Sequence, residues 1–374
     1  MANIIVLGSG MVGRAITLDL AKKHQVTATD MSAKALETIN NSNVEKKILD
    51  FTDTAALKAM LQPFNLIVSA VPGFLGYKTM QTIIESGKNF CDISFLPEGI
   101  EPLNELAKQK GVTGIMDMGV APGMPNLIAG FHDARMKMEN FEYYVGGLPF
   151  ERTFPFEYKA PFSPVDVLEE YTRPARLKEN GVVVTKPAMS ETELMNFPGI
   201  GTLEAFNSDG LRSLLYLLPN VPNMKEKTLR YPGYIRLIQA LMAAGFFSHK
   251  SIKVKGNEVI PFDVTASILF DAWKLQPTER EFTVMRVIAE GTDKGAKKIV
   301  QYDLFDEYDP NESISSMART TGFTATAGAE LILQGLFKEK GVNPPEIVGK
   351  NEECFNFVMN YLGDRSVKYM ITEK

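Results

Sequence analysis

Three glycines near the start of the chain are spaced for binding a phosphate. They lie in the segment 8–13, which follows the apolar run 3–7 and precedes residues with helical spacing. Gly8 permits a tight turn, Gly10 lets the backbone approach a pyrophosphate, and Gly13 lets the helix lie close to the sheet. The free N–H groups at the start of the helix would bind the phosphates. The pattern predicts a dinucleotide site formed by Gly8, Ser9, Gly10, Met11, Val12 and Gly13.

An acidic residue follows where a ribose would be bound. Asp30 closes the second strand-like run, 26–29, about 20 residues after the glycines, where a carboxylate accepts hydrogen bonds from both ribose hydroxyls. A carboxylate repels a 2′-phosphate, and residues 31–33 contain no arginine. We therefore expect NAD rather than NADP as the cofactor. The alternative is a glycine-rich turn that binds no ligand.

The elements that must position these residues follow a regular order. The first 120 residues alternate between strand-like and helix-like segments, and 66–72 is the clearest buried strand after the first. The alternation predicts the α/β class, with a Rossmann domain built on a doubly wound parallel sheet. Ligands of such sheets bind at the carboxyl ends of the strands. Further cofactor contacts are expected there from Asp50, Ala70, Val71, Pro72 and Ser94.

The pattern changes beyond this half of the chain. The segment 119–125 is a rigid turn rich in Pro and Gly, and Asn126 fits as the N-cap of a helix over 127–136. Later segments alternate like antiparallel strands. These segments are 182–186, 252–255, 282–290 and 297–305.

The chain is long enough for two domains. A second, mixed-sheet α/β domain that binds the substrate is expected over 123–322. A helix over 324–340 would return the chain to the first domain. The Rossmann domain should therefore comprise 1–122 and be completed by C-terminal helices within 323–374.

Charged and amide side chains in the second half could hold an amino-acid substrate. Arg230 presents a planar fork that binds a carboxylate through two hydrogen bonds, and Tyr231 lies beside it. The alternative is an arginine in an ion pair across the domain interface. Glu204 and Asp209 could hold an ammonium group, and Asn207 a carboxylate or an amide. Asn-Ser-Asp-Gly is also a common composition for a tight turn.

Two further candidates lie near the predicted edge of the parallel sheet. Asp92 belongs to the strand-like run 90–94, where it would face a nicotinamide ring and could hydrogen-bond an amine. It is the candidate base that the sequence offers, and its alternative role is that of a turn or cap residue. Asn126 could contact the substrate, although capping is the more common role for an asparagine at a helix start.

The composition argues against several classes of protein. A formal net charge of −5 gives no basic surface for nucleic acid or an anionic membrane, and no 18-residue apolar run is present. The three histidines and two cysteines show no metal-ligand spacing, so no metal is expected. The first strand begins at Asn3, which leaves no room for a signal peptide, and two free thiols are typical of a reducing compartment. We expect a cytoplasmic protein.

Several motifs together resemble those of the saccharopine dehydrogenase-like oxidoreductases, over nearly the whole chain. The N-terminal fingerprint is shared with many families, whereas the other four motifs are specific in combination. These motifs are Gly-Val-Ala-Pro-Gly at 119–123, Gly-Gly-Leu-Pro at 146–149, the segment 201–210, and Thr-Leu-Arg-Tyr-Pro-Gly at 228–233.

The resemblance implies a homodimeric, NAD-dependent oxidoreductase with a small amino-acid substrate. Within the family the chain is most similar to the lysine 6-dehydrogenases. This similarity implies oxidation of the ε-carbon of L-lysine, with release of ammonia and formation of 2-aminoadipate 6-semialdehyde. The amine must be neutral when the hydride leaves, and its reference pKa is about 10.4. The site must therefore lower that pKa, supply a base, or operate at alkaline pH.

One residue departs from the family pattern. Ala121 stands before Pro-Gly, where saccharopine reductases usually carry an acid, and this departure disfavours saccharopine as the substrate. A saccharopine dehydrogenase or a carboxynorspermidine dehydrogenase-type enzyme remains an alternative, and it would need a second carboxylate clamp. A protein that senses NAD without turnover is the alternative of a different class.

Overall fold

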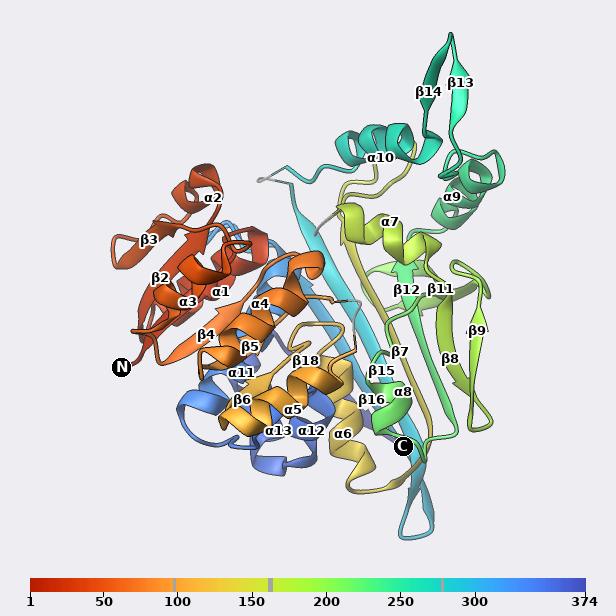
Figure 1. Ribbon diagram of the computed structural model, residues 1–374. Helices are drawn as coiled ribbons and strands as arrows, with labels where there is room; N and C mark the ends of the chain where they lie inside the picture. Colours follow the sequence, from red (N-terminus) through yellow and green to blue (C-terminus); the bar gives the residue numbers. More distant parts are fainter. Residues whose placement is uncertain (97–98, 161–163, 277–278) are drawn as a thin grey trace.

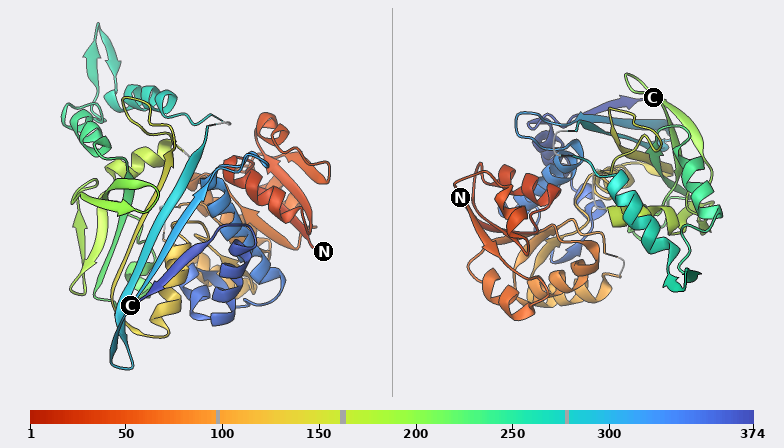
Figure 2. Two further views of the ribbon diagram at one scale, coloured as in Figure 1. Left: turned by 180° about the vertical axis from the view of Figure 1, so that it is seen from behind. Right: turned by 90° about the horizontal axis from the view of Figure 1, so that it is seen from above.

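The chain forms two lobes, each built on one large β-sheet, and a small separate hairpin. The computed structural model describes residues 1–374 apart from 97–98, 161–163 and 277–278 (Figure 1). Figure 2 shows that the N-terminus lies in one lobe, while the C-terminus lies on the sheet of the other.

The first sheet is parallel and has seven strands. In spatial order they are β17 (Gly341–Asn343), β6 (Thr113–Ile115), β5 (Asn89–Asp92), β4 (Leu66–Ser69), β1 (Asn3–Leu7), β2 (Gln25–Asp30) and β3 (Val44–Ile48). The connecting helices are α1 (Met11–Leu20), α2 (Ala33–Glu37), α3 (Thr54–Leu61), α4 (Gly73–Glu85) and α5 (Glu101–Lys110). The order reverses between β1 and β4, which confirms the doubly wound Rossmann sheet and places its ligand edge beside the glycine turn.

The second sheet has nine strands and is mixed, as expected. Its main path is β10 (Glu193–Phe197), β11 (Gly201–Asn207), β12 (Asn223–Arg230), β7 (Lys137–Pro149), β15 (Glu281–Asp293), β16 (Ala296–Glu307) and β18 (Tyr369–Glu373), while β8 (Ala175–Glu179) and β9 (Val182–Lys186) branch from β12. β12 and β7 run parallel, whereas the other recorded pairs are antiparallel. The last strand, β18, therefore lies in the second sheet.

Helices and one hairpin surround the second sheet. The helices are α6 (Met124–Asp133), α7 (Pro164–Thr172), α8 (Leu214–Leu217), α9 (Tyr234–Ala243) and α10 (Pro261–Ala272). The hairpin of β13 (Ile252–Val254) and β14 (Asn257–Val259) projects from the lobe beside α9 and α10 (Figure 1). Three further helices, α11 (Ser316–Leu333), α12 (Pro345–Lys350) and α13 (Glu352–Gly363), follow β16 along the chain.

Helix α11 connects the two sheets. It begins at Ser316 rather than at the expected residue 324, because the side chain of Ser315 accepts a hydrogen bond from the N–H of Ala318 and caps the helix. The helix contacts α1, β4 and β5 in the first lobe and β15 and β16 in the second. One buried cluster joins Val6, Phe323 and Met285, so the two lobes share a hydrophobic core.

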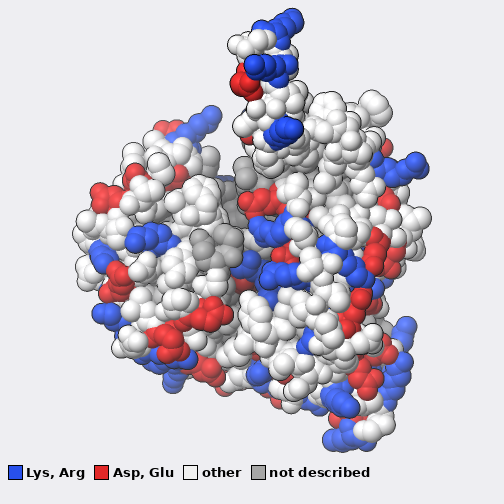
Figure 3. All heavy atoms as spheres, turned by 45° about the vertical axis from the view of Figure 1, so that its right-hand side comes forward, with Lys and Arg blue, Asp and Glu red and all other residues white. Residues whose placement is uncertain are grey.

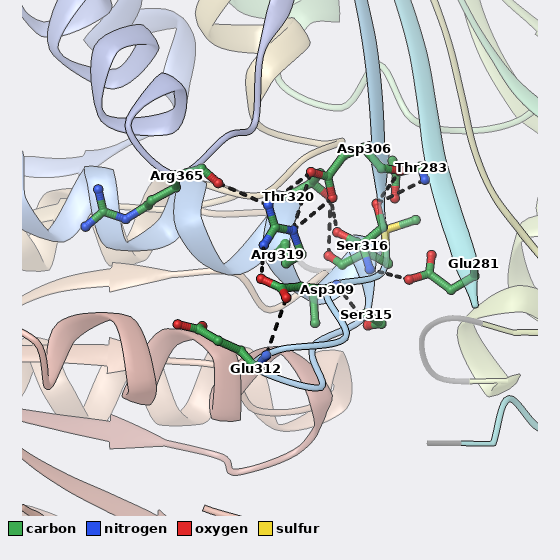
Figure 4. A network of polar contacts seen from close by, with 12 residues as sticks. Glu281, Thr283, Asp306, Asp309, Glu312, Ser315, Ser316, Arg319, Thr320 and Arg365 are labelled. Atoms are coloured by element: carbon green, nitrogen blue, oxygen red, sulfur yellow. Dashed lines mark hydrogen bonds and ion pairs between the residues drawn. The ribbon is translucent and has the colours of Figure 1, made fainter. Parts of the chain in front are cut away.

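Polar contacts fix the start of α11 to the second sheet (Figure 4). Arg319 donates from Nε to Oδ2 of Asp306 at 3.2 Å, and from Nη1 to Oδ2 of Asp309 at 3.0 Å. Ser316 donates from Oγ to the carbonyl oxygen of Asp306 at 2.9 Å. Arg319 also donates to the carbonyl of Arg365 at 3.0 Å. These contacts hold the end of β16 on a helix that rests against the parallel sheet.

The packing of α1 on β1 leads to a first prediction. A Cβ added at Gly13 would lie 2.0 Å from the carbonyl oxygen of Gly8. This oxygen belongs to the backbone, so the helix or the turn would have to shift to relieve the clash. We expect Gly13→Ala to lower the free energy of unfolding by about 1–3 kcal/mol in a urea titration. Gly10→Ala is the matched control, because no atom lies within 4 Å of its added Cβ. Equal stability of the two variants would contradict the close contact.

Candidate functional site

The glycine turn is built as a phosphate site. Gly8 has a φ of 95°, and a Cβ there would lie 2.5 Å from the carbonyl oxygen of Ala70, so the ends of β1 and β4 are in contact. Gly10 is the N-cap of α1, and no side chain caps this helix. The first N–H groups of α1 are therefore available to an anion, and the space beside Gly10 is open to it. These features fit the pyrophosphate of a dinucleotide.

Asp30 is held at the end of β2 by the backbone of the turn. Its Oδ2 accepts a hydrogen bond from the N–H of Ser9, and its Oδ1 accepts one from the N–H of Ser32, each at 2.8 Å. The buried Ser9 donates from Oγ to the carbonyl of Thr29 at 3.1 Å. Each carboxylate oxygen keeps a second lone pair for a ribose hydroxyl. The acid and the turn therefore form one unit that fits an adenosine ribose.

The other residues predicted to bind the cofactor lie at the ends of strands or the starts of helices. Asp50, after β3, is exposed and accepts a hydrogen bond from the N–H of Thr52 at 2.8 Å. Met11 and Val12 begin α1, Val71 and Pro72 lead into α4, and Ser94 follows β5. Their contacts with a cofactor remain a prediction.

Asp92 ends β5 and is fully buried. Its Oδ1 accepts hydrogen bonds from the N–H and the Oγ of Ser94, at 2.9 and 2.7 Å. Its Oδ2 makes no hydrogen bond of ordinary geometry within the described part of the chain, although the buried hydroxyl of Ser69, on the paired strand, lies near enough to lower the pKa of the carboxyl. Burial raises the pKa of Asp92 to about 7. Asp92 therefore has the turn role that the sequence allowed as an alternative. Its Oδ2 is an additional acceptor at the edge of the parallel sheet.

An ion pair links the two lobes beside this edge. Arg212, just before α8, donates from Nε to Oδ2 of Asp117, which follows β6, at 2.9 Å. Arg212 also donates to the carbonyl of Leu96 at 3.0 Å, and its guanidinium lies 4.0 Å from the ring centroid of Phe95. Figure 3 shows acidic and basic side chains gathered where the lobes meet.

Asn126 belongs to a second contact between the lobes. The expectation that Asn126 is the N-cap residue is wrong: Gly123 is the N-cap of α6, which begins at Met124. Asn126 takes part in capping from the third position of the helix, where its Oδ1 accepts a hydrogen bond from the N–H of Gly123 at 3.1 Å. Its Nδ2 donates to Oε1 of Glu346 at 3.0 Å, and Ser213 donates to the same oxygen at 2.7 Å. Burial raises the pKa of Glu346 to about 7. The amide therefore has protein partners on both of its ends.

Arg230 ends β12 inside the second lobe. Its Nη2 donates to Oε2 of Glu170 at 2.8 Å, and its Nε donates to the hydroxyl of Tyr171 at 3.1 Å. The ring of Tyr158 lies 4.4 Å from the guanidinium, and the side chain of Arg230 is 2% exposed. The arginine is thus paired with an acid of its own lobe, and a substrate carboxylate would have to compete with Glu170.

Glu204 and Asp209 make separate local contacts. Glu204 accepts a hydrogen bond from the N–H of Gly233 at the start of α9, at 2.9 Å. Asp209 pairs with Arg176, with Nη2 and Oδ2 2.9 Å apart. The two carboxylates therefore have different partners.

Asn207 and Tyr231 also have partners within the second lobe. Asn207 donates from Nδ2 to Oε2 of Glu191 at 3.0 Å, and its buried Oδ1 has no partner in the described residues. The hydroxyl of Tyr231 donates to the carbonyl of Pro149 at 2.8 Å. A substrate role for these four residues remains a prediction.

Sequence reasoning missed several buried polar residues, both between the lobes and inside the second lobe. The missed residues are Asp117, Glu170, Arg212, Glu226 and Glu346. One signal was available, because Glu226, Thr228 and Arg230 alternate along one strand and must share a face. The other missed residues have partners that are distant in the sequence, so no local sequence pattern indicated their contacts.

Membrane-spanning helices and metal-binding clusters are both absent from the residues that the structure describes. No helix among them is both long and apolar enough to cross a membrane. No group of three or more His, Cys, Asp or Glu side chains among them could hold a metal ion.

Fold and site define a two-domain protein with a dinucleotide-binding Rossmann lobe. A model of the saccharopine dehydrogenase NADP binding domain matches residues 4–115, and a model of the saccharopine dehydrogenase C-terminal domain matches residues 119–367. The chain belongs to the saccharopine dehydrogenase family, which confirms the resemblance seen in the motifs.

Two curated relatives and one solved structure illustrate the similarity. Saccharopine dehydrogenase (NADP(+), L-glutamate-forming) of Schizosaccharomyces pombe is 29% identical over 288 residues, covering 72% of this chain and 64% of the relative. Carboxyaminopropylagmatine dehydrogenase of Synechocystis is 20% identical over 368 residues, covering 91% and 92%. Apo saccharopine dehydrogenase (L-Glu forming) from Saccharomyces cerevisiae superposes with a TM-score of 0.83 at 19% identity, covering 100% of both chains. The chain spans less than two thirds of the fission yeast enzyme.

The buried acids predict how stability depends on pH. Burial raises the pKa of Glu346 to about 7, whereas an unfolded glutamate titrates near ~4.3. Between these values the folded state binds the extra proton, so the free energy of unfolding falls as the pH rises. We expect Glu346→Gln to flatten this slope by up to ~1.4 kcal/mol per pH unit in urea titrations.

The control for this measurement is Glu105→Gln, which changes an exposed acid on α5. It should leave the slope unchanged. A wild-type slope that Glu346→Gln does not alter would show that Glu346 is ionised in the folded protein at neutral pH.

Proposed function

We propose that the protein is an NAD-dependent dehydrogenase that oxidises the ε-carbon of L-lysine to 2-aminoadipate 6-semialdehyde and releases ammonia. The observation that carries this proposal is the free Oδ2 of Asp92, a buried acceptor at the carboxyl end of β5. β5 pairs with β4, whose end contacts the glycine turn through Ala70. An amine bound there would lie beside a dinucleotide held by the turn. A homodimer and a cytoplasmic location remain predictions.

The chemistry needs a group that accepts a proton from the amine. An ammonium cannot release hydride, and the ionised Asp92 offers an oxygen to take its proton. A bound nicotinamide would supply the hydride acceptor. Because the pKa of Asp92 is raised to about 7, the carboxylate form that can accept the proton predominates above that pH.

The preference for NAD rests on Asp30. The family model that matches this half is described as NADP binding. In this chain, however, the carboxylate of Asp30 is fixed by Ser9 and Ser32, at the place where a 2′-phosphate would lie. Charge repulsion between the two groups supports NAD.

A related reaction on a larger amine is the second candidate. The carboxyaminopropylagmatine dehydrogenase of Synechocystis matches over 92% of its own length, which favours a secondary amine of the carboxynorspermidine type. Saccharopine would need a second cationic group to bind its additional carboxylate. Arg230 and Arg212 do not offer one, because Arg230 is paired with Glu170 and Arg212 with Asp117. Saccharopine is therefore the weaker alternative.

A substrate panel tests the reaction. With NAD, we expect NADH to form with L-lysine and not with ornithine, saccharopine or carboxynorspermidine, at a rate that rises as the pH passes about 7. Asp92→Asn should lower kcat by roughly 100-fold or more, since it removes the proton acceptor, and should leave NAD affinity unchanged. Turnover of carboxynorspermidine alone would select the second candidate. Tight NAD binding without turnover of any amine would favour a sensor.

Cofactor preference is tested at Asp30. We expect Asp30→Ala to weaken NAD binding by roughly 10- to 100-fold, through loss of a charge-assisted hydrogen bond worth about 1.5–3 kcal/mol, and to weaken NADP binding less or not at all. Calorimetric titration of both cofactors measures this difference. Asp364→Asn, just after α13, is the control. Wild-type protein that binds NADP more tightly than NAD would overturn the assignment.

A further inference from the structure

A chain of four side chains crosses the second lobe from a buried carboxyl to a half-buried one. Glu226 and Thr228 lie on one face of β12, Ser208 follows β11, and Glu170 lies on α7. Oγ of Ser208 lies 2.9 Å from Oε1 of Glu226 and 2.8 Å from Oγ1 of Thr228. Oγ1 of Thr228 lies 2.8 Å from Oε1 of Glu170. All three separations are hydrogen-bond distances between oxygens.

The hydrogens of this chain can be counted. Each contact needs one hydrogen, and the hydroxyls of Ser208 and Thr228 supply one each. A third hydrogen must come from a carboxyl group, because an ionised carboxylate only accepts. One of the two glutamates is therefore protonated, whichever way the hydroxyls point.

The contacts at the two ends place this proton on Glu226. Glu170 accepts from the guanidinium of Arg230 at 2.8 Å, which favours its ionised form. Glu226 is fully buried, and its Oε2 accepts from the N–H of Gly210 at 2.9 Å, which leaves Oε1 to carry the proton. The donors then run in one direction, from Glu226 through Ser208 and Thr228 to Glu170.

The charged surroundings agree with a neutral carboxyl at this position. Glu170 faces it from α7, Asp209 from the loop after β11, and Tyr143 from the paired register of β7. The two nearby arginines are paired with other acids, Arg176 with Asp209 and Arg230 with Glu170. No cation of the described residues forms an ion pair with the buried carboxyl, and burial raises its pKa to about 8.

The half-buried end of the chain lies on α7, next to a residue that contacts the loop at the candidate site. The side chain of Glu170 is 24% exposed. Just past the end of α7, the guanidinium of Arg173 lies 5.3 Å from the ring centroid of Phe95, in the loop that follows Asp92. Helix α7 therefore joins the proton chain to the edge of the parallel sheet.

We propose that Glu226, Ser208, Thr228 and Glu170 form a proton relay that stores one proton and delivers it at Glu170. The presence of the proton follows from the hydrogen count, whereas its delivery to the substrate rests on the proposed function. When the imine product reacts with water, a carbinolamine forms. The proton of Glu226 reaches Glu170 as the O–H bonds of Ser208 and Thr228 break and re-form along the chain. As the C–N bond of the carbinolamine breaks, the bonding pair goes to nitrogen, which gains this proton from Glu170. The carbinol hydroxyl loses its proton to water as the aldehyde forms, and a proton taken from water at Glu170 returns along the same hydroxyls to Glu226.

Infrared spectroscopy tests the stored proton without any substrate. The wild-type protein at neutral pH should show a protonated carboxyl band that shifts in D2O, and the component of this band that belongs to Glu226 should be lost in Glu226→Gln. Glu281→Gln is the matched control, because it removes another buried acid whose pKa is raised to about 8, and the band of Glu226 should survive in it. A Glu226→Gln spectrum equal to that of the wild type would overturn the proposal.

Kinetics tests the relay. Thr228→Val and Ser208→Ala should each lower kcat by roughly 100-fold and change its solvent isotope effect, with little change in KM or in NAD affinity. Thr228→Ser keeps the hydroxyl and should restore turnover. Thr324→Val is the control, because this buried threonine donates only to the carbonyl of Thr320 in its own helix. Normal turnover in Thr228→Val would overturn the relay.

The two tests separate the two proposals. If the wild type turns over no amine, the proposed function fails, while the infrared band still decides whether the proton is shared. If the band is present and the relay variants keep full activity, the stored proton stands and its catalytic use is refuted.

Discussion

The structure depends on the burial of carboxyl groups between and beside its two sheets. Asp92, Glu226 and Glu346 are buried, and burial raises the pKa of each to about 7 or 8. A buried carboxylate without a cation is costly, so such groups hold a proton or accept several hydrogen bonds. In this protein they do so with Ser, Asn and backbone partners, while the arginines nearby are engaged elsewhere. The three acids therefore have no cation among the described residues as a partner, and one of them, Glu346, belongs to a contact between the lobes.

Much of the first lobe could be predicted from the sequence. The glycines of the turn and Asp30 lie within one continuous segment, so their types and spacing carry the whole geometry. The strand alternation predicted the sheet for the same reason, since neighbouring strands are joined by short crossovers. The start of α11 was misplaced because Ser315 caps it, and a single serine gives a weak signal within a polar segment.

The polar groups between the lobes could not be predicted in the same way. Arg212 pairs with Asp117, and Glu346 with Asn126, across large separations in the sequence. Which partner an arginine or a buried acid finds depends on how the lobes are packed. The same limit holds inside one lobe. The type and setting of Arg230 suggested a carboxylate partner, and only the structure showed that this partner is Glu170, from α7.

Helix α11 has a consequence for the energetics of the whole molecule. It packs on α1, beside the glycine turn, and on β15 and β16 of the other lobe, within a hydrophobic cluster that both lobes share. Neither lobe can then unfold without exposing apolar surface of the other, so the chain should melt as one cooperative unit. By mass action, a nucleotide that binds only the folded turn raises the melting temperature of the second sheet, which it never touches.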